Sequence, residues 1–296
     1  MMNKMITKFN VIIPMAGESS RFDYNFKPFL NLDNRVFIEH VLDSFGKLDI
    51  ESYNFIITEE QEKNNSIFET LKKIFPQIYN KINVVIINKK THGPFQTIRT
   101  GLHQLNHLDN VFICDCDHYV NVDPILFKLE QKNYLDIIIP VWTIKDYEYK
   151  NWGKVIIDSK NDYIVDFCEK EKFEKTSQFY AKGVIGCYYF KSSSEILNSK
   201  KDYVNFSDFF KDNHKNYDID LAHIESAYFF GDPKMVKKAV QDRRKKETVF
   251  CDVDGVLLKH KDCSNDFIDD NFIIGMAAEK IKKWRLKLQK KTLGRL

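Results

Sequence analysis

Residues 9–27 read Phe-Asn-Val-Ile-Ile-Pro-Met-Ala-Gly-Glu-Ser-Ser-Arg-Phe-Asp-Tyr-Asn-Phe-Lys, an apolar run followed at once by small and polar residues. A short β-branched run bounded by Pro and Gly predicts a buried strand at 9–15 with a tight loop after it. Small residues let a loop turn its backbone N–H groups toward a phosphate, and Arg21 and Lys27 add positive charge. The stretch predicts a phosphate-binding loop, with a plain strand-to-turn connection as the alternative.

Further apolar runs alternate with helical patterns along the first half of the chain. The other strand-like runs are 53–58, 82–88, 111–115 and 135–142, and the helix-like segments are 37–45, 66–75 and 94–105. Ser66 followed by Glu69 matches a capping box at the start of the second helix. The alternation predicts an α/β fold, with a Rossmann-like mixed, mostly parallel central sheet and flanking helices. Ligands bind at the carboxyl ends of strands in such sheets, so we expect the site in the loops after the first and fourth strands.

The pattern changes from about residue 153. Strand-like pieces at 153–157, 163–168, 184–190 and 219–224 have few clear helices between them, which indicates an antiparallel addition that completes the site. The charge run at 242–247 has the composition of a linker or an exposed helix end. We therefore expect two parts, a first domain at 1–245 and a small segment at 246–296.

Composition narrows the class of protein. The 296 residues are 43% hydrophobic and 29% charged, which is ordinary for a globular protein and excludes wholesale disorder. Residues 279–296 hold an excess of Lys and Arg, so the rest of the chain is slightly acidic, which argues against a nucleic-acid partner. The sequence has no run of about 18 apolar residues, so no membrane span is predicted. The six cysteines have no disulfide or zinc spacing, and we expect a reduced, cytoplasmic protein.

The first loop resembles the signature of the nucleotidyltransferase (sugar-phosphate pyrophosphorylase) family. Ala16, Gly17, Arg21 and Lys27 match that signature, whereas Ser19 stands where the family usually has a second Gly. A serine fits there without strain if its φ is negative, and it costs about 1 kcal/mol if φ is positive.

Later motifs extend the resemblance over roughly residues 9 to 240. The stretch Gly93-Pro-Phe-Gln-Thr97 is similar to the family's segment that faces the base, and Asp115-Cys-Asp117 is similar to its strand-end Asp motif. The pair Glu169-Lys170 is similar to the one that contacts the sugar phosphate, and residues 182–190 and 230–234 are similar to a following strand and a closing turn.

The resemblance implies an activity and a set of residues. The activity is transfer of an NMP group from an NTP, with CTP favoured, to a sugar phosphate or a similar small phosphorylated acceptor, with release of pyrophosphate. It implies Mg²⁺ as cofactor and a place in capsule or other surface polysaccharide synthesis. The implied catalytic residues are Arg21 and Lys27, and the implied metal ligand is Asp117. Implied nucleotide-binding residues are Met15, Ala16, Gly17, Glu18, Ser19, Ser20, Gly93, Thr97 and Asp115, and implied acceptor-binding residues are Gly153, Glu169, Lys170 and Gly186. No nucleic-acid or membrane partner is expected, and a homo-oligomer is compatible with the sequence.

Several of these positions also have plainer interpretations. Asp115 fits a cap or a ribose contact as well as a metal site, and Asp117 fits a carboxylate in a turn. Glu169 and Lys170 lie in a charged stretch that is typical of a solvated face, and His118 is typical of a structural histidine. The family's second metal carboxylate is missing, because Phe229 stands at its position; Glu225 and Asp232 are the nearest substitutes.

A different motif follows in the last part of the chain. The run 249–257, with Asp252-Val-Asp254-Gly after a short apolar stretch, resembles motif I of the haloacid dehalogenase (HAD) phosphatases. The remaining chain is too short for the downstream motifs of that superfamily, so we expect a truncated and inactive HAD-like segment. The alternative functions are a glycosyltransferase of related fold that uses a sugar nucleotide, a HAD-type phosphatase, and a nucleotide-binding regulator without activity.

Overall fold

The computed structural model describes residues 7–88, 90–144, 152–171 and 173–244. The chain divides into two units, Met1–Val240 and Gln241–Leu296, and the fold described below is that of the first. The expected domain boundary at 245/246 and the HAD-like motif with Asp252 and Asp254 lie outside the described residues and stay predictions. Within the described ranges, no helix has the length and apolar character needed to cross a membrane.

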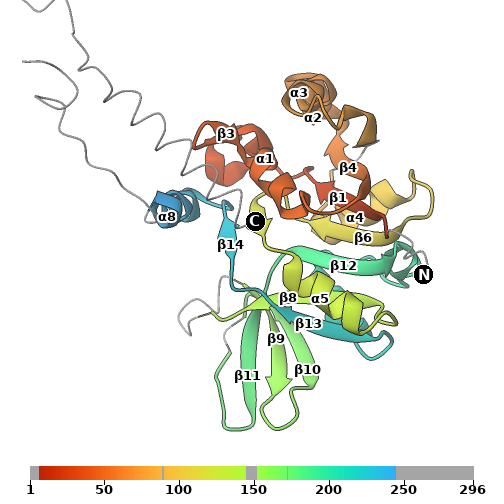
Figure 1. Ribbon diagram of the computed structural model, residues 1–296, viewed down its shortest axis with the longest axis vertical. Helices are drawn as coiled ribbons and strands as arrows, with labels where there is room; N and C mark the ends of the chain where they lie inside the picture. Colours follow the sequence, from red (N-terminus) through yellow and green to blue (C-terminus); the bar gives the residue numbers. More distant parts are fainter. Residues whose placement is uncertain (1–6, 89, 145–151, 172, 245–296) are drawn as a thin grey trace, which may run out of the picture. The chain divides into compact units, whose positions relative to one another are not determined.

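A ten-stranded mixed sheet forms the centre of the first unit, in the order β10-β9-β11-β8-β12-β6-β1-β4-β5, with β13 beside β8 (Figure 1). The parallel part consists of β6 (Asp109–Cys114), β1 (Phe9–Pro14), β4 (Ile50–Thr58) and β5 (Ile82–Ile87). The antiparallel pairs are made by β8 (Ile137–Trp142), β9 (Gly153–Asp158), β10 (Ile164–Glu169), β11 (Phe179–Val184) and β12 (Cys187–Ser192), while β13 (Ile219–His223) runs parallel to β8. The Rossmann-like α/β fold expected from the sequence is confirmed.

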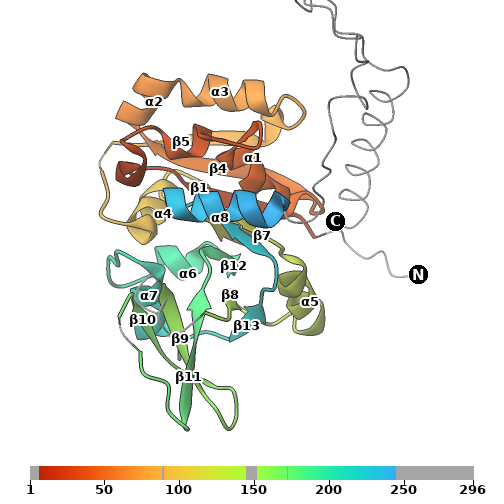
Figure 2. The same cartoon turned by 90° about the vertical axis from the view of Figure 1, so that its left-hand side faces the viewer.

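Helices cover both faces of this sheet (Figure 2). Successive side chains of a strand point to opposite faces, so Val11 and Ile13 join one apolar cluster and Ile12 joins the other. The first cluster includes residues of α1 (Phe37–Leu42), α3 (Ile67–Ile74) and α5 (Asp123–Gln131). The second includes residues of α4 (Pro94–Leu102), α6 (Ser194–Leu197) and α7 (Phe206–Asn213). Two-sided burial explains why β1 is apolar apart from Asn10, whose side chain is buried and hydrogen-bonded.

Two small sheets lie at the ends of the central strands. One pairs β7 (His118–Val120) with β14 (Ala227–Phe229), and the other pairs β2 (Asn31–Leu32) with β3 (Arg35–Val36). The helix α8 (Pro233–Arg244) follows β14, and its Ala239 packs in a cluster with Leu32, Phe37 and Phe230. The remaining elements are α2 (Glu59–Asn65) and the 3-10 turns η1 (Ser20–Phe22), η2 (Lys27–Phe29), η3 (Asp43–Phe45) and η4 (Tyr79–Lys81).

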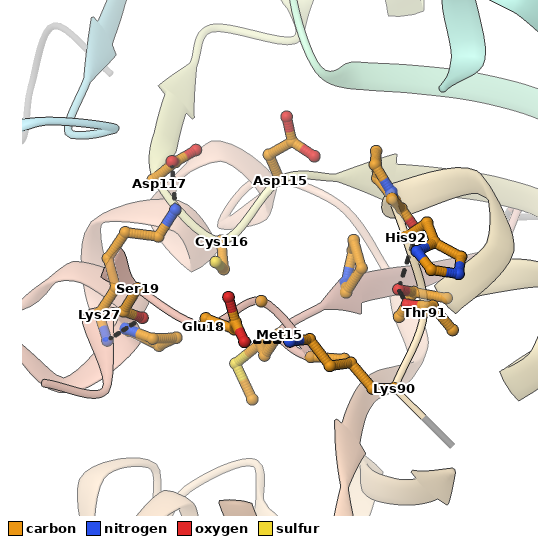
Figure 3. Close-up of a pocket in the computed structure, with 17 residues that line it drawn as sticks. Met15, Glu18, Ser19, Lys27, Lys90, Thr91, His92, Asp115, Cys116 and Asp117 are labelled. Atoms are coloured by element: carbon orange, nitrogen blue, oxygen red, sulfur yellow. Dashed lines mark hydrogen bonds and ion pairs between the residues drawn. The ribbon is translucent and has the colours of Figure 1, made fainter. Parts of the chain in front are cut away.

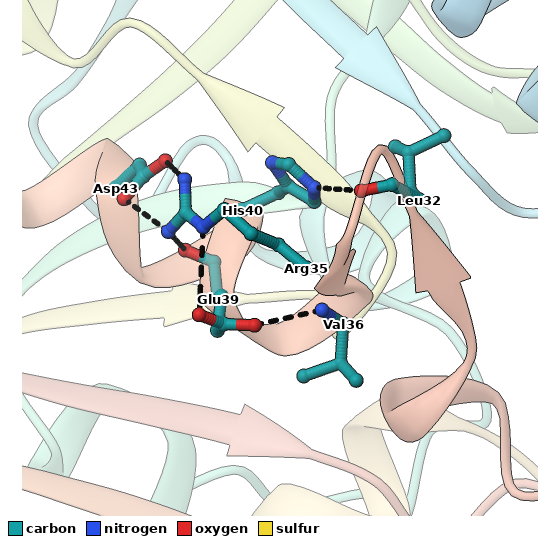
Figure 4. A network of polar contacts seen from close by, with 6 residues as sticks. All are labelled: Leu32, Arg35, Val36, Glu39, His40 and Asp43. Carbon is teal, nitrogen blue, oxygen red and sulfur yellow. Dashed lines mark hydrogen bonds and ion pairs between the residues drawn. The ribbon is translucent and has the colours of Figure 1, made fainter. Parts of the chain in front are cut away.

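A polar network fixes the β2–β3 hairpin to α1 (Figure 4). The Arg35 guanidinium donates to both carboxylate oxygens of Asp43, at 2.6 and 2.9 Å, and this bidentate geometry is the strongest form of such a pair. The backbone N–H of Val36 donates to Glu39 at 2.7 Å, and the His40 ring lies 2.9 Å from the carbonyl oxygen of Leu32. The network anchors the segment that directly follows η2, where Lys27 is located.

The structure corrects two local expectations. Ser66 is not the first residue of a capping box, because its φ of 47° makes it the left-handed end of α2; the capping box is made by Thr58 and Gln61. The strand expected at 184–190 is β12, which begins only at Cys187, and β11, which ends before the break at Ile185 and Gly186, was not predicted. The helices α2, α5 and α7 were not predicted. The helix α2 has no apolar residue, whereas Phe206, Phe209 and Phe210 of α7 have helical spacing that was not recognised.

Candidate active site

The loop after β1 is held in place by side-chain and backbone hydrogen bonds. Gln61 donates from Nε2 to the carbonyl oxygens of Met15 and Gly17, both at 3.0 Å, and the Met15 N–H donates to the carbonyl of Ile56 at 2.8 Å. Gln61 belongs to the first turn of α2, where its side chain also caps the helix. The start of α2 therefore sets the path of the loop.

Ser19 adopts the left-handed conformation, with φ of 56°. A residue with a Cβ pays about 1 kcal/mol for this conformation, as expected above for a positive φ. The Ser19 hydroxyl accepts a hydrogen bond at 3.0 Å from the backbone N–H of Lys27. This contact offsets part of the strain and links the loop to the segment that carries Lys27, a role that Gly cannot supply.

A pocket of about 470 Å³ opens beside this loop, at the carboxyl ends of β1, β5 and β6 (Figure 3). This volume lies within the usual range for small-molecule sites. The pocket is lined by Pro14, Met15, Ala16, Gly17, Glu18, Ser19, Lys27, Pro28, Lys90, Thr91, His92, Gly93, Pro94, Thr97, Asp115, Cys116 and Asp117. The structure thus brings together most of the residues expected to bind nucleotide, with Lys27, expected to be catalytic, and Asp117, the expected metal ligand, beside them.

Lys27 and Asp117 form a largely buried ion pair in this pocket, with 2.6 Å between Nζ and Oδ2. Burial alone raises the pKa of the Asp117 carboxyl, but the Lys27 ammonium and His118 outweigh burial and lower that pKa to about 2. Burial alone lowers the pKa of Lys27, yet Asp117 outweighs it and holds that pKa above its usual range. Both groups are therefore charged at neutral pH.

Asp115 and His118 stand beside this pair. His118 Nε2 lies 3.2 Å from Asp117 Oδ1, and His118 Nδ1 lies 3.8 Å from Asp115 Oδ2. Burial raises the pKa of the Asp115 carboxyl to about 6, against the lowering effect of His118. One ligand atom from each of Asp115, Asp117 and His118 falls within 4.8 Å of the others. Two carboxylates and an imidazole at this spacing fit a divalent cation, and the carboxylates are the hard oxygen donors that Mg²⁺ takes.

The β14 segment lies against Asp117 and His118. The Phe230 N–H donates to the Asp117 carbonyl at 2.8 Å, and Phe229 pairs with His118 in the two-stranded sheet. Asp232 is not placed as a second metal ligand, because its carboxylate caps α8 by accepting from the N–H groups of Lys234 and Met235. Glu225 is exposed and precedes the strand, at the end away from His118.

Arg21 lies near the pocket but does not line it. Its Nη1 donates to the Gly231 carbonyl at 3.4 Å, and its charge contributes to the lowered pKa of Asp117. Ser20 is exposed in the same 3-10 turn and also lies outside the lining. Of the two residues expected to be catalytic, the pocket as it stands includes Lys27 only.

The residues expected to bind the acceptor lie outside the pocket lining, although Gly186 packs against the lining residue Asp115. Gly153 pairs with Glu169 across β9 and β10, and Ser207 Oγ donates to the Glu169 carboxylate at 2.7 Å. Lys170 Nζ lies 3.2 Å from that carboxylate, and it is near enough to Asp115 to oppose the rise in the Asp115 pKa. Glu169 is thus a hydrogen-bonded group and not a freely solvated one.

Gly186 has a role that the sequence did not suggest. A Cβ at this position would lie 2.1 Å from Asp115 Oδ2 and 2.6 Å from Asp115 Cγ, so only Gly leaves room for this carboxylate. The Gly186 carbonyl also accepts from the Asp115 N–H at 2.7 Å. The break between β11 and β12 is therefore the place where the strand makes space for a site carboxylate.

Three aromatic rings lie beside the cluster of Asp115, Asp117 and His118. Trp142, Trp152 and Phe229 lie in mutual contact, with centroids 4.7–4.9 Å apart, and the Phe229 ring meets His118 edge-on at 5.0 Å. All three rings are half-buried, as expected for residues of a pocket wall or the edge of the core. Their contacts place an apolar surface next to the acidic cluster.

The sequence analysis missed Lys90, Thr91 and His92, which line the opposite side of the pocket. Lys90 forms an ion pair with Glu18, and the Thr91 hydroxyl lies 2.5 Å from that of Thr97. The signal was available, because these residues follow the carboxyl end of the strand β5, and our expectation considered only the loops after the first and fourth strands.

Known proteins are similar to this chain in part of its sequence and in its fold. Residues 11–150 match a family model described as the MobA-like NTP transferase domain. No curated protein matches the sequence of this chain. Among solved structures, a UDP-glucose pyrophosphorylase complexed with UDP-glucose matches with a TM-score of 0.64 and 17% identity, over 81% of this chain and 100% of that one.

Two further solved structures are similar. The UTP-bound UGPase from Acinetobacter baumannii has a TM-score of 0.62 and 13% identity, over 81% of this chain and 95% of that one. HddC from Yersinia pseudotuberculosis, complexed with GMP-PN, has a TM-score of 0.58 and 18% identity, over 79% of this chain and 99% of that one.

The fold is therefore that of the nucleotidyltransferases that include nucleotide-sugar pyrophosphorylases. Within it, residues 11–150 are the part of the chain that matches the MobA-like NTP transferase domain. The matched region contains the loop after β1, the Gly93 turn, and the cluster of Asp115, Asp117 and His118.

Proposed function

We propose that this protein transfers an NMP group from an NTP to a small phosphorylated acceptor and releases pyrophosphate. The observation that carries the proposal is the Lys27–Asp117 ion pair, which stands in a pocket formed by the loop after β1 and the Gly93 turn. The buried Lys27 ammonium faces the space in which the triphosphate would approach the acceptor phosphate. A sugar phosphate is the acceptor that we favour, and CTP is the favoured nucleotide.

The reaction needs no protein nucleophile, because an oxygen of the acceptor phosphate is itself one. That oxygen attacks the α-phosphorus of the NTP, a new P–O bond forms, and the bond between the α-phosphorus and the bridging oxygen breaks as pyrophosphate leaves. Two anions must approach each other, so catalysis consists of positioning and charge neutralisation. Lys27 stabilises the charge on the α-phosphate, and Arg21 turns from the Gly231 carbonyl to bind the departing pyrophosphate.

The remaining residues orient the two substrates. The backbone of residues 15–20 and the turn at Gly93 hold the nucleotide, with Thr97 beside the base and Asp115 near the ribose or the metal. Asp117 would hold Mg²⁺, with Asp115 as the neighbouring carboxylate, and the bound ion would supply neutralisation of phosphate charge. Lys170 holds the acceptor phosphate, while Glu169, Gly153 and Gly186 shape the acceptor side. A role in making capsule or another surface polysaccharide is part of this proposal.

Pyrophosphate release tests the proposal directly. A matrix of CTP, UTP, GTP and dTTP against phosphorylated sugars, polyols and amines is assayed for pyrophosphate, with Lys27→Met as the matched inactive control. Release that depends on both substrates supports transfer, and its absence over the whole matrix rejects it. A second assay with UDP-glucose as the only donor distinguishes a glycosyltransferase from a nucleotidyltransferase, because a glycosyltransferase releases a nucleoside diphosphate and no pyrophosphate.

A further inference from the structure

His118 carries a buried polar atom that is not satisfied within the part of the chain that the structure describes. The residue is only 8% exposed, and its Nδ1 has no hydrogen-bond partner there. A buried nitrogen left unpaired costs about 1–3 kcal/mol, so such a group generally has a role beyond packing. The ring lies edge-on against Phe229, with centroids 5.0 Å apart, which leaves its nitrogens directed along the ring plane.

Both ring nitrogens face carboxylates. Nδ1 lies 3.8 Å from Asp115 Oδ2, beyond hydrogen-bond distance, and Nε2 lies 3.2 Å from Asp117 Oδ1. Lys27 Nζ is bound to the other oxygen of Asp117, Oδ2, at 2.6 Å. The oxygen of Asp117 that Lys27 leaves available is therefore the one that faces His118.

Backbone contacts hold these three residues in one arrangement. The Asp115 N–H donates to the Gly186 carbonyl at 2.7 Å, and the Asp117 carbonyl accepts from Phe230 at 2.8 Å. His118 begins β7 and pairs with Phe229 of β14. A ligand set fixed on both sides loses little conformational freedom when a cation binds, which distinguishes it from a cluster of surface acids.

We propose that Asp115, Asp117 and His118 form one divalent-cation site in which the His118 imidazole is a direct ligand, and that this site prefers Mn²⁺ to Mg²⁺. Mg²⁺ takes oxygen ligands and keeps its waters, whereas a transition-metal ion accepts an imidazole nitrogen together with carboxylates. The imidazole supplies the third protein ligand where Phe229 occupies the expected place of a carboxylate. The inference rests on the proposed function only where it gives the bound cation a role in catalysis. Binding of the cation by these three residues does not depend on turnover.

The test measures Mn²⁺ binding to the whole chain in the absence of any nucleotide. Loss of the EPR signal of free Mn²⁺ gives stoichiometry and affinity, and pulsed EPR detects ¹⁴N modulation from a directly bound imidazole. His118→Phe keeps a ring against Phe229 and removes both nitrogens, and His118→Gln is a second variant in case the first does not fold. The control is His107→Gln, since His107 is a half-exposed histidine 3.0 Å from Asp109 on the surface.

We expect one bound Mn²⁺ with ¹⁴N modulation, and weaker binding of Mg²⁺ in competition. Replacing His118 should remove the modulation and lower Mn²⁺ affinity by at least the ~10-fold that loss of an outer-shell partner costs, while His107→Gln changes neither. Bound Mn²⁺ without ¹⁴N modulation, unchanged affinity in the His118 variants, Mg²⁺ binding as tightly as Mn²⁺, or no stoichiometric Mn²⁺ binding would overturn the inference. Failure of the pyrophosphate assay with this Mn²⁺ result intact would reject the proposed function alone.

Discussion

Lys27 and Asp117 are 90 positions apart in the sequence, yet Lys27 Nζ and Asp117 Oδ2 lie 2.6 Å apart in a largely buried setting. Each charge compensates the burial cost of the other, because an isolated buried ion is strongly disfavoured. The pair joins the loop after β1 to the turn after β6, which are the two segments that the proposed chemistry needs in one place.

Removing the Lys27 ammonium should abolish most of the transfer activity. We expect Lys27→Met to lower turnover by about 10²-fold or more, because it removes charge stabilisation at the reacting phosphate. The measurement is the steady-state rate of pyrophosphate release. Lys47→Met is the control, since Lys47 forms an exposed ion pair with Asp123 and should leave the rate unchanged. Equal rates for the two variants would exclude Lys27 from the mechanism.

The lowered pKa of Asp117 makes its contribution to stability depend on pH. The folded value of about 2 lies below the unfolded value of 3.8, so ionised Asp117 stabilises the folded protein above the unfolded pKa, and this contribution is lost as pH falls toward 2. We expect Asp117→Asn to reduce the free energy of unfolding at pH 7 by on the order of 2 kcal/mol, and by less near pH 3. Urea unfolding of both proteins at the two pH values measures the difference. A deficit that is the same at both pH values contradicts the assignment.

Substitutions at Gly186 and Asp115 should have strongly coupled effects on the free energy of unfolding. Gly186→Ala places a Cβ inside the volume of the Asp115 carboxylate, and we expect a loss of about 1–3 kcal/mol in the free energy of unfolding. Because Asp115→Ala removes the clashing atoms, the double variant should be clearly more stable than the sum of the single effects predicts. Gly46→Ala is the control, since its Cβ would meet only an ordinary contact at 3.7 Å. Additive effects at positions 186 and 115 would show that the close approach is not what requires Gly.

Replacing Ser19 with Gly should destabilise the protein less than replacing it with Ala. Ser19→Gly relieves the left-handed strain while losing the hydrogen bond to the Lys27 N–H, whereas Ser19→Ala loses the hydrogen bond and keeps the strain. We expect the Ala variant to be less stable than the Gly variant by about 1 kcal/mol. Thermal unfolding of the three proteins gives the order. An Ala variant as stable as wild type would mean that the hydrogen bond does not matter, and an Ala variant as stable as the Gly variant would contradict the strain.

Local sequence patterns determined much of the fold. Apolar runs bounded by Pro and Gly were enough to predict β1 and the loop after it, because a strand buried on both faces needs an uninterrupted apolar run. Short sequence motifs also brought Gly17, Lys27, Gly93 and Asp117 to attention as members of one site, and the pocket contains all four. The parallel strands carry these residues to the same edge of the sheet.

Tertiary structure alone decided the features that depend on residues far apart in the sequence. Gly186 adjoins Asp115 only because β12 pairs with β6, and His118 meets Phe229 only because β14 returns to β7. Lys90 reaches the pocket because β5 ends at the same edge as β1, and the position of Arg21 outside the lining depends on its contact with Gly231. Sequence periodicity reports which face of a strand is buried, but which strands become neighbours is decided by the packing of the whole chain.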